Sequence, residues 1–403
     1  MTGSPQLLVV GGGPCGLMTG LLFARAGVSV RVVEKHRDFL HDFRGDTVHP
    51  STMEVFHELG LLARFLARPH QRLSRAELRI GGKEMVVGDL SRVSSRTPFV
   101  AMMPQWEFLD FLREEASKLP NFRFDLGCGV EDYLEEENGR IVGVRLSNGE
   151  EVRPALTIAA DGRHSLVRRL GLLPVRDLGS PIDVFWFELP KRAAETSALR
   201  IAVDGGRILV RVDRGSYWQC ALVFPKGHAA VLRAEGLAAI VAQIEAVEPR
   251  LGSIAGDLSG IDDLHLLEVT LDRLRRWHRP GLLAIGDAAH AMSPMGGIGI
   301  NLAIQDAVAA SNLLAGPLRR GEPVDLLLAK VQRRREGSTR LIQLIQKLAQ
   351  DHVLARLLRR PAALARPPLP LRLLQRFPAL RRLPGRVIAL GIRRERVDCS
   401  LAA

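Results

Sequence analysis

The chain has 403 residues, of which 46% are hydrophobic and 25% charged, a composition typical of a globular protein that buries a large core in two or three domains. The four cysteines are scattered without a C-x-x-C pair, and no apolar run reaches the roughly 18 residues of a membrane-spanning helix, so the sequence predicts neither a disulfide framework, nor a structural zinc site, nor a membrane span. The net charge of +12 comes from residues 330–403, where 18 lysines and arginines accompany four acids, and we therefore expect no nucleic-acid partner for the body of the protein.

The first 35 residues predict a dinucleotide-binding unit. An apolar strand over 6–10 leads into Gly11-Gly12-Gly13-Pro14-Cys15-Gly16, a helix follows, and a second strand ends on Glu34. Gly11 permits a tight turn, Gly13 lets the backbone approach a pyrophosphate, and Gly16 allows close packing of helix on strand. Glu34 is placed to bind a ribose diol and disfavours a 2′-phosphate, so FAD or NAD is expected. An ordinary glycine-rich turn would explain the glycines but not the acid.

The next segment mixes helices and short strands. Residues 50–60 predict a helix that ends at Gly60, and residues 105–118 predict a second helix. A hairpin is expected over 75–87 and a strand over 98–103. Three strands follow at 129–135, 141–146 and 151–159, joined by Asn-Gly turns into a β-meander.

A second motif, Asp161-Gly162-Arg163-His164-Ser165-Leu166-Val167-Arg168, follows the apolar strand that ends at 159 and opens a helix. Residues 183–224 predict an antiparallel sheet, followed by a helix over 232–247 and a strand over 266–271. A further buried strand, 280–285, leads into Gly286-Asp287-Ala288-Ala289-His290 and then Pro294-Met295-Gly296-Gly297-Ile298-Gly299-Ile300-Asn301, with a helix over 300–314. The glycines before this helix are a second place where backbone N–H groups can face a phosphate or an electron-rich ring.

The basic C-terminal part is rich in Leu, Arg and Pro, and its prolines predict short helical pieces after residue 354. Two interpretations stay open for it. It contacts an anionic membrane surface, or it packs on the rest of the protein with arginine stems covering apolar surface.

The three motifs in this order resemble the single-component FAD-dependent aromatic hydroxylases, the p-hydroxybenzoate hydroxylase-like flavoprotein monooxygenases, over about residues 5–330. The resemblance implies an α/β fold with a Rossmann-like FAD-binding domain containing an inserted β-meander, an antiparallel-sheet substrate domain and a helical C-terminal region. We assign the FAD-binding domain to 1–72, 104–175 and 276–330, the substrate domain to 73–103 and 176–275, and the basic extension to 331–403.

The resemblance also implies the residues that hold FAD. The pyrophosphate would lie on Gly11, Gly13 and Gly16, the adenosine ribose on Glu34, and the adenine near Lys35 and Val130. Arg44 and Gln105 would approach the pyrophosphate and ribityl region. Asp161 and Arg168 belong to a motif implicated in FAD and NAD(P)H binding, and Asp287 would bind the ribityl chain. The isoalloxazine would be bracketed by Pro294, Gly296, Gly297, Gly299, Ile300 and Asn301. Asp161 could instead be a plain helix cap, Arg44 a surface ion-pair residue, His49 a turn cap, and His290 a structural hydrogen-bonding group.

The implied activity is NAD(P)H- and O2-dependent hydroxylation of an aromatic, quinone or polyketide-like substrate through a C4a-hydroperoxyflavin. No second complete dinucleotide fingerprint is present, as in this family, and the isolated tryptophans disfavour a flavin halogenase. Two alternatives remain: an FAD-dependent reductase or dehydrogenase of a prenyl or quinone-like lipid, and a flavin-loaded binding protein whose basic tail recruits partners. We expect a cytoplasmic protein, because residues 1–5 lack the features of a secretion signal. We expect a monomer or homodimer, and we identify no catalytic base and no metal ligand.

Overall fold

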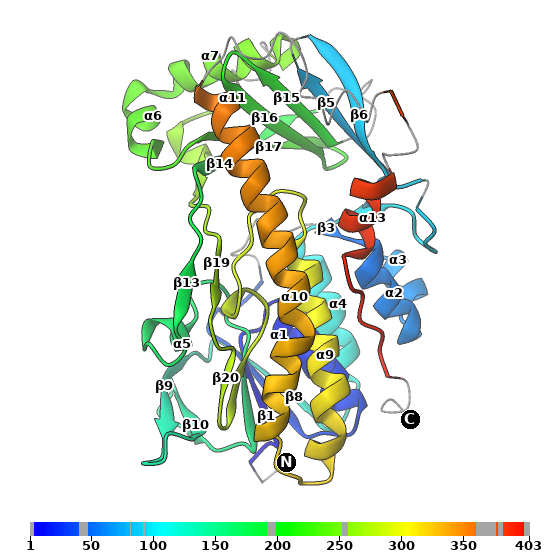
Figure 1. Cartoon of the computed structure of the whole chain (residues 1–403), viewed down its shortest axis with the longest axis vertical. Coiled ribbons are helices and arrows are strands. Elements are labelled where there is room, and N and C mark those ends of the chain that lie inside the picture. The colour runs from blue at the N-terminus through cyan, green and yellow to red at the C-terminus, as the bar shows by residue number, and fades with distance from the viewer. Residues whose placement is uncertain are drawn as a thin grey trace.

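Two sheets lie at opposite ends of the molecule, and the long helix α10 (Asp325–Ala349) runs from one to the other (Figure 1). The computed structural model describes residues 4–39, 47–80, 82–91, 93–191, 199–251, 257–359, 376–377 and 382–398. The α/β architecture predicted from the sequence is confirmed, with one parallel sheet, one largely antiparallel sheet and a helical C-terminal region.

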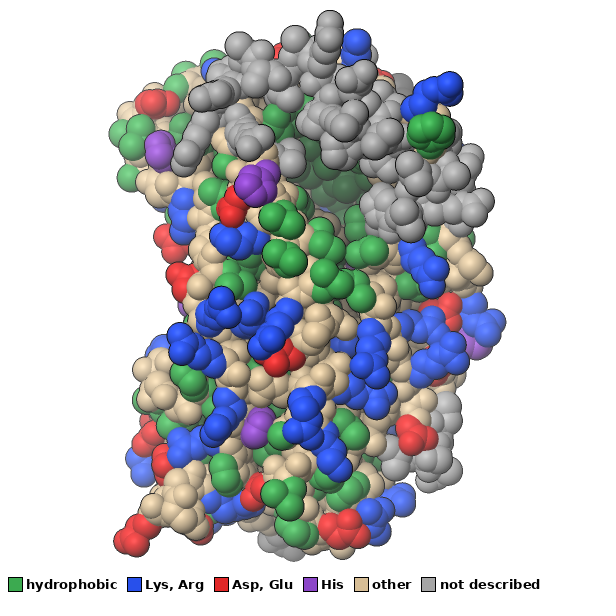
Figure 2. Space-filling model, viewed as in Figure 1, with side chains coloured by type: hydrophobic (Ala, Val, Ile, Leu, Met, Phe, Trp, Pro, Cys, Tyr) green, Lys and Arg blue, Asp and Glu red, His purple; other side chains and the backbone are tan. Residues whose placement is uncertain are grey.

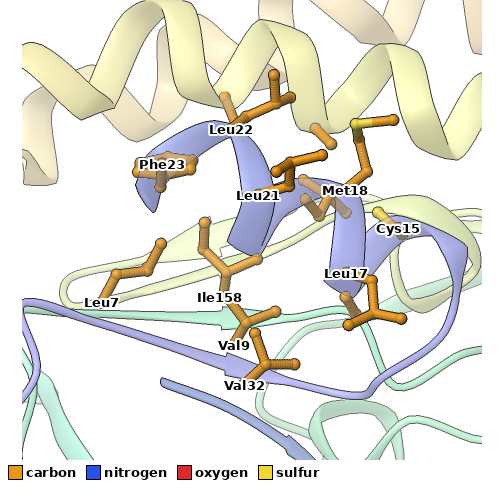
Figure 3. Packing of buried hydrophobic residues seen from close by; sticks show 14 of the residues in the cluster. Leu7, Val9, Cys15, Leu17, Met18, Leu21, Leu22, Phe23, Val32 and Ile158 are labelled. Atoms are coloured by element: carbon orange, nitrogen blue, oxygen red, sulfur yellow. The ribbon is translucent and has the colours of Figure 1, made fainter. Parts of the chain in front are cut away.

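The first sheet has six strands in the order β20-β21-β12-β1-β2-β8, parallel throughout except for the edge strand β20. Its strands are β1 (Leu7–Val10), β2 (Val30–Glu34), β8 (Phe122–Leu126), β12 (Leu156–Ala159), β20 (His278–Arg279) and β21 (Leu282–Ala284). The central strands are continuous apolar runs because helices cover the sheet, which is the pattern of a parallel sheet buried on both faces. Figure 3 shows Leu7 and Val9 packed beneath Leu17 and Leu21 of α1 (Pro14–Arg25). Helices α4 (Gln105–Ser117) and α9 (Gly299–Arg319) flank α1.

Smaller sheets surround this core. The meander consists of β9 (Val130–Glu135), β10 (Ile141–Leu146) and β11 (Glu151–Val152). The strand expected over 151–159 is in fact two strands, because Pro154 interrupts it and β12 joins the six-stranded sheet instead. The two remaining small sheets contain β3 (Thr47–Val48), β7 (Val100–Met102) and β4 (Gln71–Leu73) in one, and β13 (Val175–Asp177) and β19 (Asp272–Leu274) in the other.

The second large sheet has seven strands in the order β18-β14-β17-β16-β15-β5-β6. They are β5 (Arg75–Ile80), β6 (Lys83–Asp89), β14 (Ile182–Pro190), β15 (Leu199–Asp204), β16 (Arg207–Asp213), β17 (Tyr217–Pro225) and β18 (His265–Leu267). All neighbours are antiparallel except β15 and β5, because β5 arrives from a distant part of the chain and not through a hairpin. The helix expected over 232–247 is two helices, α6 (Ala229–Glu235) and α7 (Leu237–Val247), broken at Gly236, whose φ is +87°.

Short helices complete the described elements. They are α2 (Pro50–Glu58), α3 (Leu62–Leu66), α5 (Leu166–Arg169), η1 (Pro249–Leu251), η2 (Ile261–Asp263), η3 (Gly286–Ala288), η4 (Gln350–Leu354), α11 (Ala355–Arg359) and α13 (Arg382–Leu390). Among the described residues, no helix is both long enough and apolar enough to cross a membrane.

Most of the described C-terminal elements contact the rest of the molecule, whereas residues 376–377 are exposed. Helix α10 starts before residue 331, so the boundary expected there falls inside a continuous helix. Leu354 and Leu357 then pack against the seven-stranded sheet. Helix α13 contacts β6 and α2, and residues 391–398 run back along α2 and α9 (Figure 1).

Candidate cofactor site

The glycine loop between β1 and α1 forms an open cradle of backbone N–H groups. Gly11 has a φ of +105°, and a methyl group at Gly16 would lie 1.8 Å from the Gly11 carbonyl oxygen, so both positions require glycine for the chain itself. Gly13 differs, because a methyl group there would meet no atom within 4 Å. Gly13 is also the residue that caps α1, and no side chain bonds the first N–H groups of this helix. The space and the free donors fit a pyrophosphate.

Glu34 lies at the end of β2 with its carboxylate fixed by two backbone donors. The Gly12 N–H donates to Oε2 at 2.7 Å, and the His36 N–H donates to Oε1 at 3.0 Å. The side chain is mostly buried, and lone pairs remain on both oxygens for a ribose diol. Lys35 is exposed and packs beside Gly129, the residue before Val130, so the predicted ribose and adenine positions meet at one edge of the sheet.

Asp161 follows β12 and lies beneath this edge. Its Oδ2 accepts a hydrogen bond from the Leu166 N–H, the first N–H of α5, at 2.8 Å, although the N-cap residue of this helix is Ser165 and not Asp161. Burial raises the pKa of Asp161 above its usual value. Burial and then the charge of Asp161 raise the pKa of the Tyr133 phenol, a buried neighbour on β9 that the sequence did not single out.

Arg168 connects the second motif to the third. Its guanidinium donates to the backbone oxygens of Asp287 and Ala288 at 2.9 and 2.8 Å and forms an ion pair with Asp272. The side chain that was expected to contact the cofactor therefore holds the backbone around Asp287. The Asp287 carboxylate is partly exposed and lies 3.5 Å from Arg163.

The loop before α9, residues 294–298, is held by a hydrogen bond from the Asn301 side chain. Gly296 and Gly297 have φ values of +83° and +60°, and α9 begins at Gly299 without a side-chain cap. The Asn301 side chain accepts hydrogen bonds from the His49 N–H at 3.1 Å and the Thr52 hydroxyl at 2.8 Å. Its amide donates to the Gly297 carbonyl at 3.3 Å. The Asn301 side chain therefore fixes the loop that runs from Pro294 to the start of α9. The backbone N–H groups of Gly299 and Ile300, in the first turn of α9, have no side-chain cap and are free to bind a ligand.

His49 occupies the cap position of α2, as predicted, but its ring does not cap the helix. The ring is almost fully buried, and Nδ1 lies 2.8 Å from the Ile388 carbonyl of α13. Burial lowers the pKa of His49 to about 4, although the hydrogen bond to Ile388 opposes this shift. His49 therefore links α13, through the Ile388 carbonyl, to Asn301 in the first turn of α9.

For two residues that we expected at the cofactor, Gln105 and Arg44, the structure gives little information. Gln105 is the first residue of α4 and is half-buried there. Arg44 lies outside the described residues.

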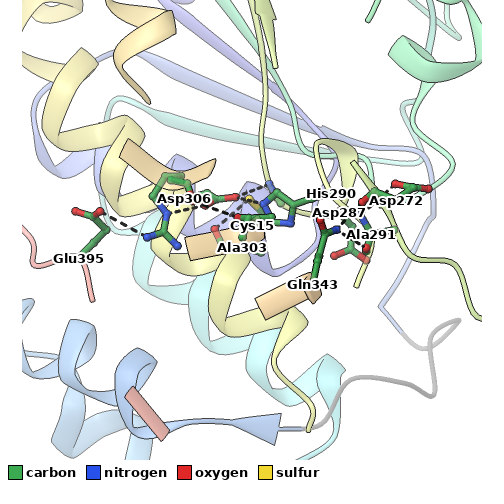
Figure 4. Close-up of polar contacts among 12 residues, drawn as sticks. Cys15, Asp272, Asp287, His290, Ala291, Ala303, Asp306, Gln343 and Glu395 are labelled. Atoms are coloured by element: carbon green, nitrogen blue, oxygen red, sulfur yellow. Dashed lines mark hydrogen bonds and ion pairs between the residues drawn. The ribbon is translucent and has the colours of Figure 1, made fainter. Parts of the chain in front are cut away.

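A buried charged network supports the third motif (Figure 4). Asp306 accepts hydrogen bonds from the Gly286 N–H at 3.1 Å, His290 Nε2 at 2.6 Å and Arg335 Nε at 2.8 Å. His290 thus has the structural role that the sequence favoured. The network itself was missed, because Arg335 stands in a run of three arginines that reads as a solvated face. The signal that could have revealed it is Asp306, a single acid in the apolar stretch of 300–314.

The comparisons with known proteins agree with this geometry. The family model described as FAD binding domain matches residues 5–344. The 6-methylpretetramide 4-monooxygenase of Streptomyces rimosus is 34% identical over 417 residues, which cover 100% of this chain and 98% of that protein. Rifampicin monooxygenase of Streptomyces venezuelae is 28% identical over 335 residues, covering 80% of this chain and 66% of that protein.

A solved structure shows the same fold. The P. aeruginosa protein PqsL, in complex with 2-aminobenzoylacetate, superposes with a TM-score of 0.76 over 88% of this chain and 97% of its own, at 23% identity. The family match spans most of the chain, and the first relative aligns over its whole length. The chain therefore belongs to the FAD-binding, p-hydroxybenzoate hydroxylase-like monooxygenase family and is an FAD-dependent oxidoreductase.

Proposed function

We propose that this protein hydroxylates a phenolic, polycyclic polyketide, with O2 as the oxygen source and NAD(P)H as the reductant. In the balanced reaction, one oxygen atom enters a C–H bond of the substrate and the other leaves as water, while NAD(P)H and a proton are consumed. The observation that carries this proposal is the end-to-end likeness to 6-methylpretetramide 4-monooxygenase, because a relative that aligns over the whole chain shares the substrate side of the fold as well as the cofactor side.

The chain's own residues fit the cofactor part of this proposal. The cradle at Gly11–Gly16 would hold the pyrophosphate of FAD, Glu34 would hold its ribose, and the start of α9 would face its isoalloxazine. When bound, FAD supplies the reduction and activation of O2. The uncapped N–H groups at the starts of α1 and α9 provide positive potential, which would stabilise the phosphates and the negative charge of a reduced flavin.

The walls beyond the flavin loop are apolar. A cluster formed by β4, β7, β16 and α13 includes Leu73, Met102, Val212 and Ala389, and it joins the small β3-β7-β4 sheet to the seven-stranded sheet. Figure 2 shows hydrophobic side chains in a hollow beside the upper part of α10. Such walls would accept a flat aromatic substrate and exclude water from a reactive oxygen species.

The test is a substrate screen that follows NAD(P)H and O2 consumption together. We expect polycyclic phenols to stimulate both and to yield a product that carries one atom from labelled O2. Monocyclic phenols should stimulate little. Full turnover without O2 on a quinone-like lipid would instead select the reductase, and tight FAD binding without turnover on any compound class would select the flavin-loaded binding protein.

We also propose that the C-terminal part contacts anionic membrane surfaces through α10. Leu341, Leu344, Ile345 and Leu348 are 43–53% exposed and recur at i, i+3, i+4 and i+7, so they form one continuous apolar stripe. Basic side chains lie beside and below the hydrophobic side chains on this face in Figure 2. An apolar stripe with a basic rim is the pattern of a helix that lies on an anionic bilayer, and it would suit a lipophilic substrate.

A further inference from the structure

A chain of buried charges connects the C-terminal segment to the turn that carries Asp287. Glu395 lies 3.5 Å from Arg335 Nη1, Arg335 Nε lies 2.8 Å from Asp306 Oδ1, and Asp306 Oδ2 bonds His290. The side chains of Glu395, Arg335, Asp306 and His290 are at most 1% exposed. Figure 4 shows Asp306 between Glu395 on one side and His290 and Asp287 on the other.

The charges in this chain depend on one another. Burial alone would raise the pKa of Asp306, but the charge and hydrogen bonds of His290 and Arg335 outweigh burial and hold that pKa below its usual value. An ionised carboxylate at this depth requires a fixed cation, and Arg335 supplies it. Glu395 in turn neutralises Arg335 and also binds Arg334, which reaches it from the surface at 2.6 Å.

The inner end of this charge network, Asp306, fixes the backbone of the 286–290 turn. Asp306 binds the Gly286 N–H, while Arg168 binds the carbonyls of Asp287 and Ala288 from the other side. Gly286 also lies directly against Cys15 of the glycine cradle, because a methyl group on Gly286 would come within 2.9 Å of the Cys15 sulfur. A shift of this turn would therefore move Asp287 and press on the pyrophosphate cradle at the same time.

The outer end of this charge network is Glu395, which lies far along the sequence from the three motifs. The Glu395 N–H donates to Gln305, beside Asp306, and the Val397 N–H donates to Glu58 at 2.8 Å. The segment 391–398 is thus attached to α9 and α2 by its backbone, and to Asp306 through the Arg335 side chain.

We propose that Glu395, Arg335 and Asp306 are positioning residues of the FAD site, and that the C-terminal segment is an integral part of that site. They hold the 286–290 turn in the shape that receives the cofactor, although none of the three touches it. This inference rests on the assignment of Asp287 to FAD and is independent of which substrate is oxidised.

The experiment titrates the full-length apoprotein with FAD and follows flavin fluorescence at 10 °C, while thermal unfolding of the same apoprotein is recorded separately. We expect E395Q to raise the dissociation constant of FAD about tenfold and D306N to raise it further, while E395D restores most of the affinity. The matched control is E248Q, which breaks another buried pair, Arg211–Glu248 at 3.0 Å, in the seven-stranded sheet. It should lower the unfolding temperature but leave FAD affinity within twofold of wild type.

The inference is overturned if E395Q and D306N lower the unfolding temperature as E248Q does while FAD affinity stays at the wild-type value. Should both variants fail to fold, R334M provides the measurement, because Arg334 is partly exposed and binds Glu395 from outside. A two- to fourfold weaker FAD affinity then supports the inference, and unchanged affinity overturns it. A wild-type protein that binds FAD but oxidises nothing would refute the proposed function and leave this inference standing.

Discussion

Single atoms decide the roles of the glycines in the first motif. All three fit the same sequence pattern, yet a Cβ atom would meet backbone at Gly11 and Gly16 and open space at Gly13. Gly11 and Gly16 are therefore required by the fold, whereas Gly13 is required only by a group that enters the space beside it. This difference separates the folding role of the motif from its binding role.

We predict opposite outcomes for two alanine substitutions. Gly13→Ala should leave the unfolding temperature of the apoprotein unchanged, because its φ of −71° suits alanine, but should weaken FAD binding at least tenfold, because the methyl group occupies the pyrophosphate space. Gly16→Ala should destabilise the apoprotein strongly, since helix and loop must separate. Thermal unfolding and FAD titration distinguish the two, and wild-type FAD affinity in Gly13→Ala would contradict the assignment.

His49 provides a pH-dependent contribution to stability. Its folded pKa of about 4 lies below the ordinary value of 6.5, so the unfolded chain binds the additional proton between these pH values. Stability is thus fully present above about pH 6.5 and is lost as the pH falls toward 4, by at most about 3 kcal/mol.

We therefore predict that His49→Asn flattens the pH dependence of the unfolding free energy between pH 7 and 5. Urea unfolding of wild type and variant at both pH values measures the difference, and all other titrating groups cancel in the comparison. The variant should lose about 2 kcal/mol less than wild type on acidification. Equal losses in the two proteins would show that His49 is already protonated in the folded state or is not buried.

At the scale of elements, α10 and η4 hold residues 291–295, the irregular stretch that leads into the loop before α9. Three buried glutamines at i, i+3 and i+7, Gln343, Gln346 and Gln350, bond the polar groups of residues 291–295. Gln346 alone accepts from the Ser293 N–H and donates to the carbonyls of Ser293 and Met295. Ala291 still accepts a backbone hydrogen bond from Asp272 of β19, but residues 293–295 belong to no strand, so helix side chains bond their backbone groups.

We predict that Gln346→Leu lowers the free energy of unfolding by about 3 kcal/mol, because three buried backbone groups lose their partner. Lys330→Leu, at an exposed position of the same helix, should change it by less than about 0.5 kcal/mol. Urea unfolding of both variants tests this, and equal effects would mean that water replaces the glutamine.

Elements with strong local signals could be predicted from the sequence, and elements fixed by tertiary contacts could not. The glycine motif with its flanking strands and the hairpin at 75–87 have the expected type. The breaks at Pro154 and Gly236 changed strand and helix assignments, because a single residue outweighed the apolar pattern around it. The network of Asp306, Arg335 and Glu395 was not predictable, since a buried arginine and a solvated one look alike in sequence.

The apolar stripe of α10 gives a prediction at the same scale. Wild type should float with anionic vesicles and not with neutral ones, and the double variant Leu344→Gln, Leu348→Gln should lose flotation at unchanged unfolding temperature. Leu326→Gln is the matched control, because Leu326 is 90% exposed at the other end of the helix and outside the stripe. Failure of wild type to float, or undiminished flotation of the double variant, would refute a membrane contact by this stripe.

At the scale of the whole molecule, the two large sheets are mechanically joined. Helix α10 carries Arg335 beneath the cofactor site, and the chain that continues from it places Leu354 and Leu357 on the seven-stranded sheet. Helix α13 adds a second connection, because His49 binds Ile388 while Ala389 packs in the apolar cluster beside the sheet. The two large sheets are thus connected by buried contacts of α10, α11 and α13.

This connection predicts that FAD stabilises both sheets together. A ligand at 100 times its dissociation constant adds about 2.7 kcal/mol to the free energy of unfolding, which slows the exchange of globally protected amides about 100-fold. Hydrogen exchange should show this slowing in β1 and β12, which lead into the proposed cofactor site, and equally in β16 and β17, which belong to the other large sheet. The intact protein with and without FAD suffices, and no substitution is needed. Slowing confined to β1 and β12 would mean that the sheets unfold separately, and that α10 and α13 transmit no stability between them.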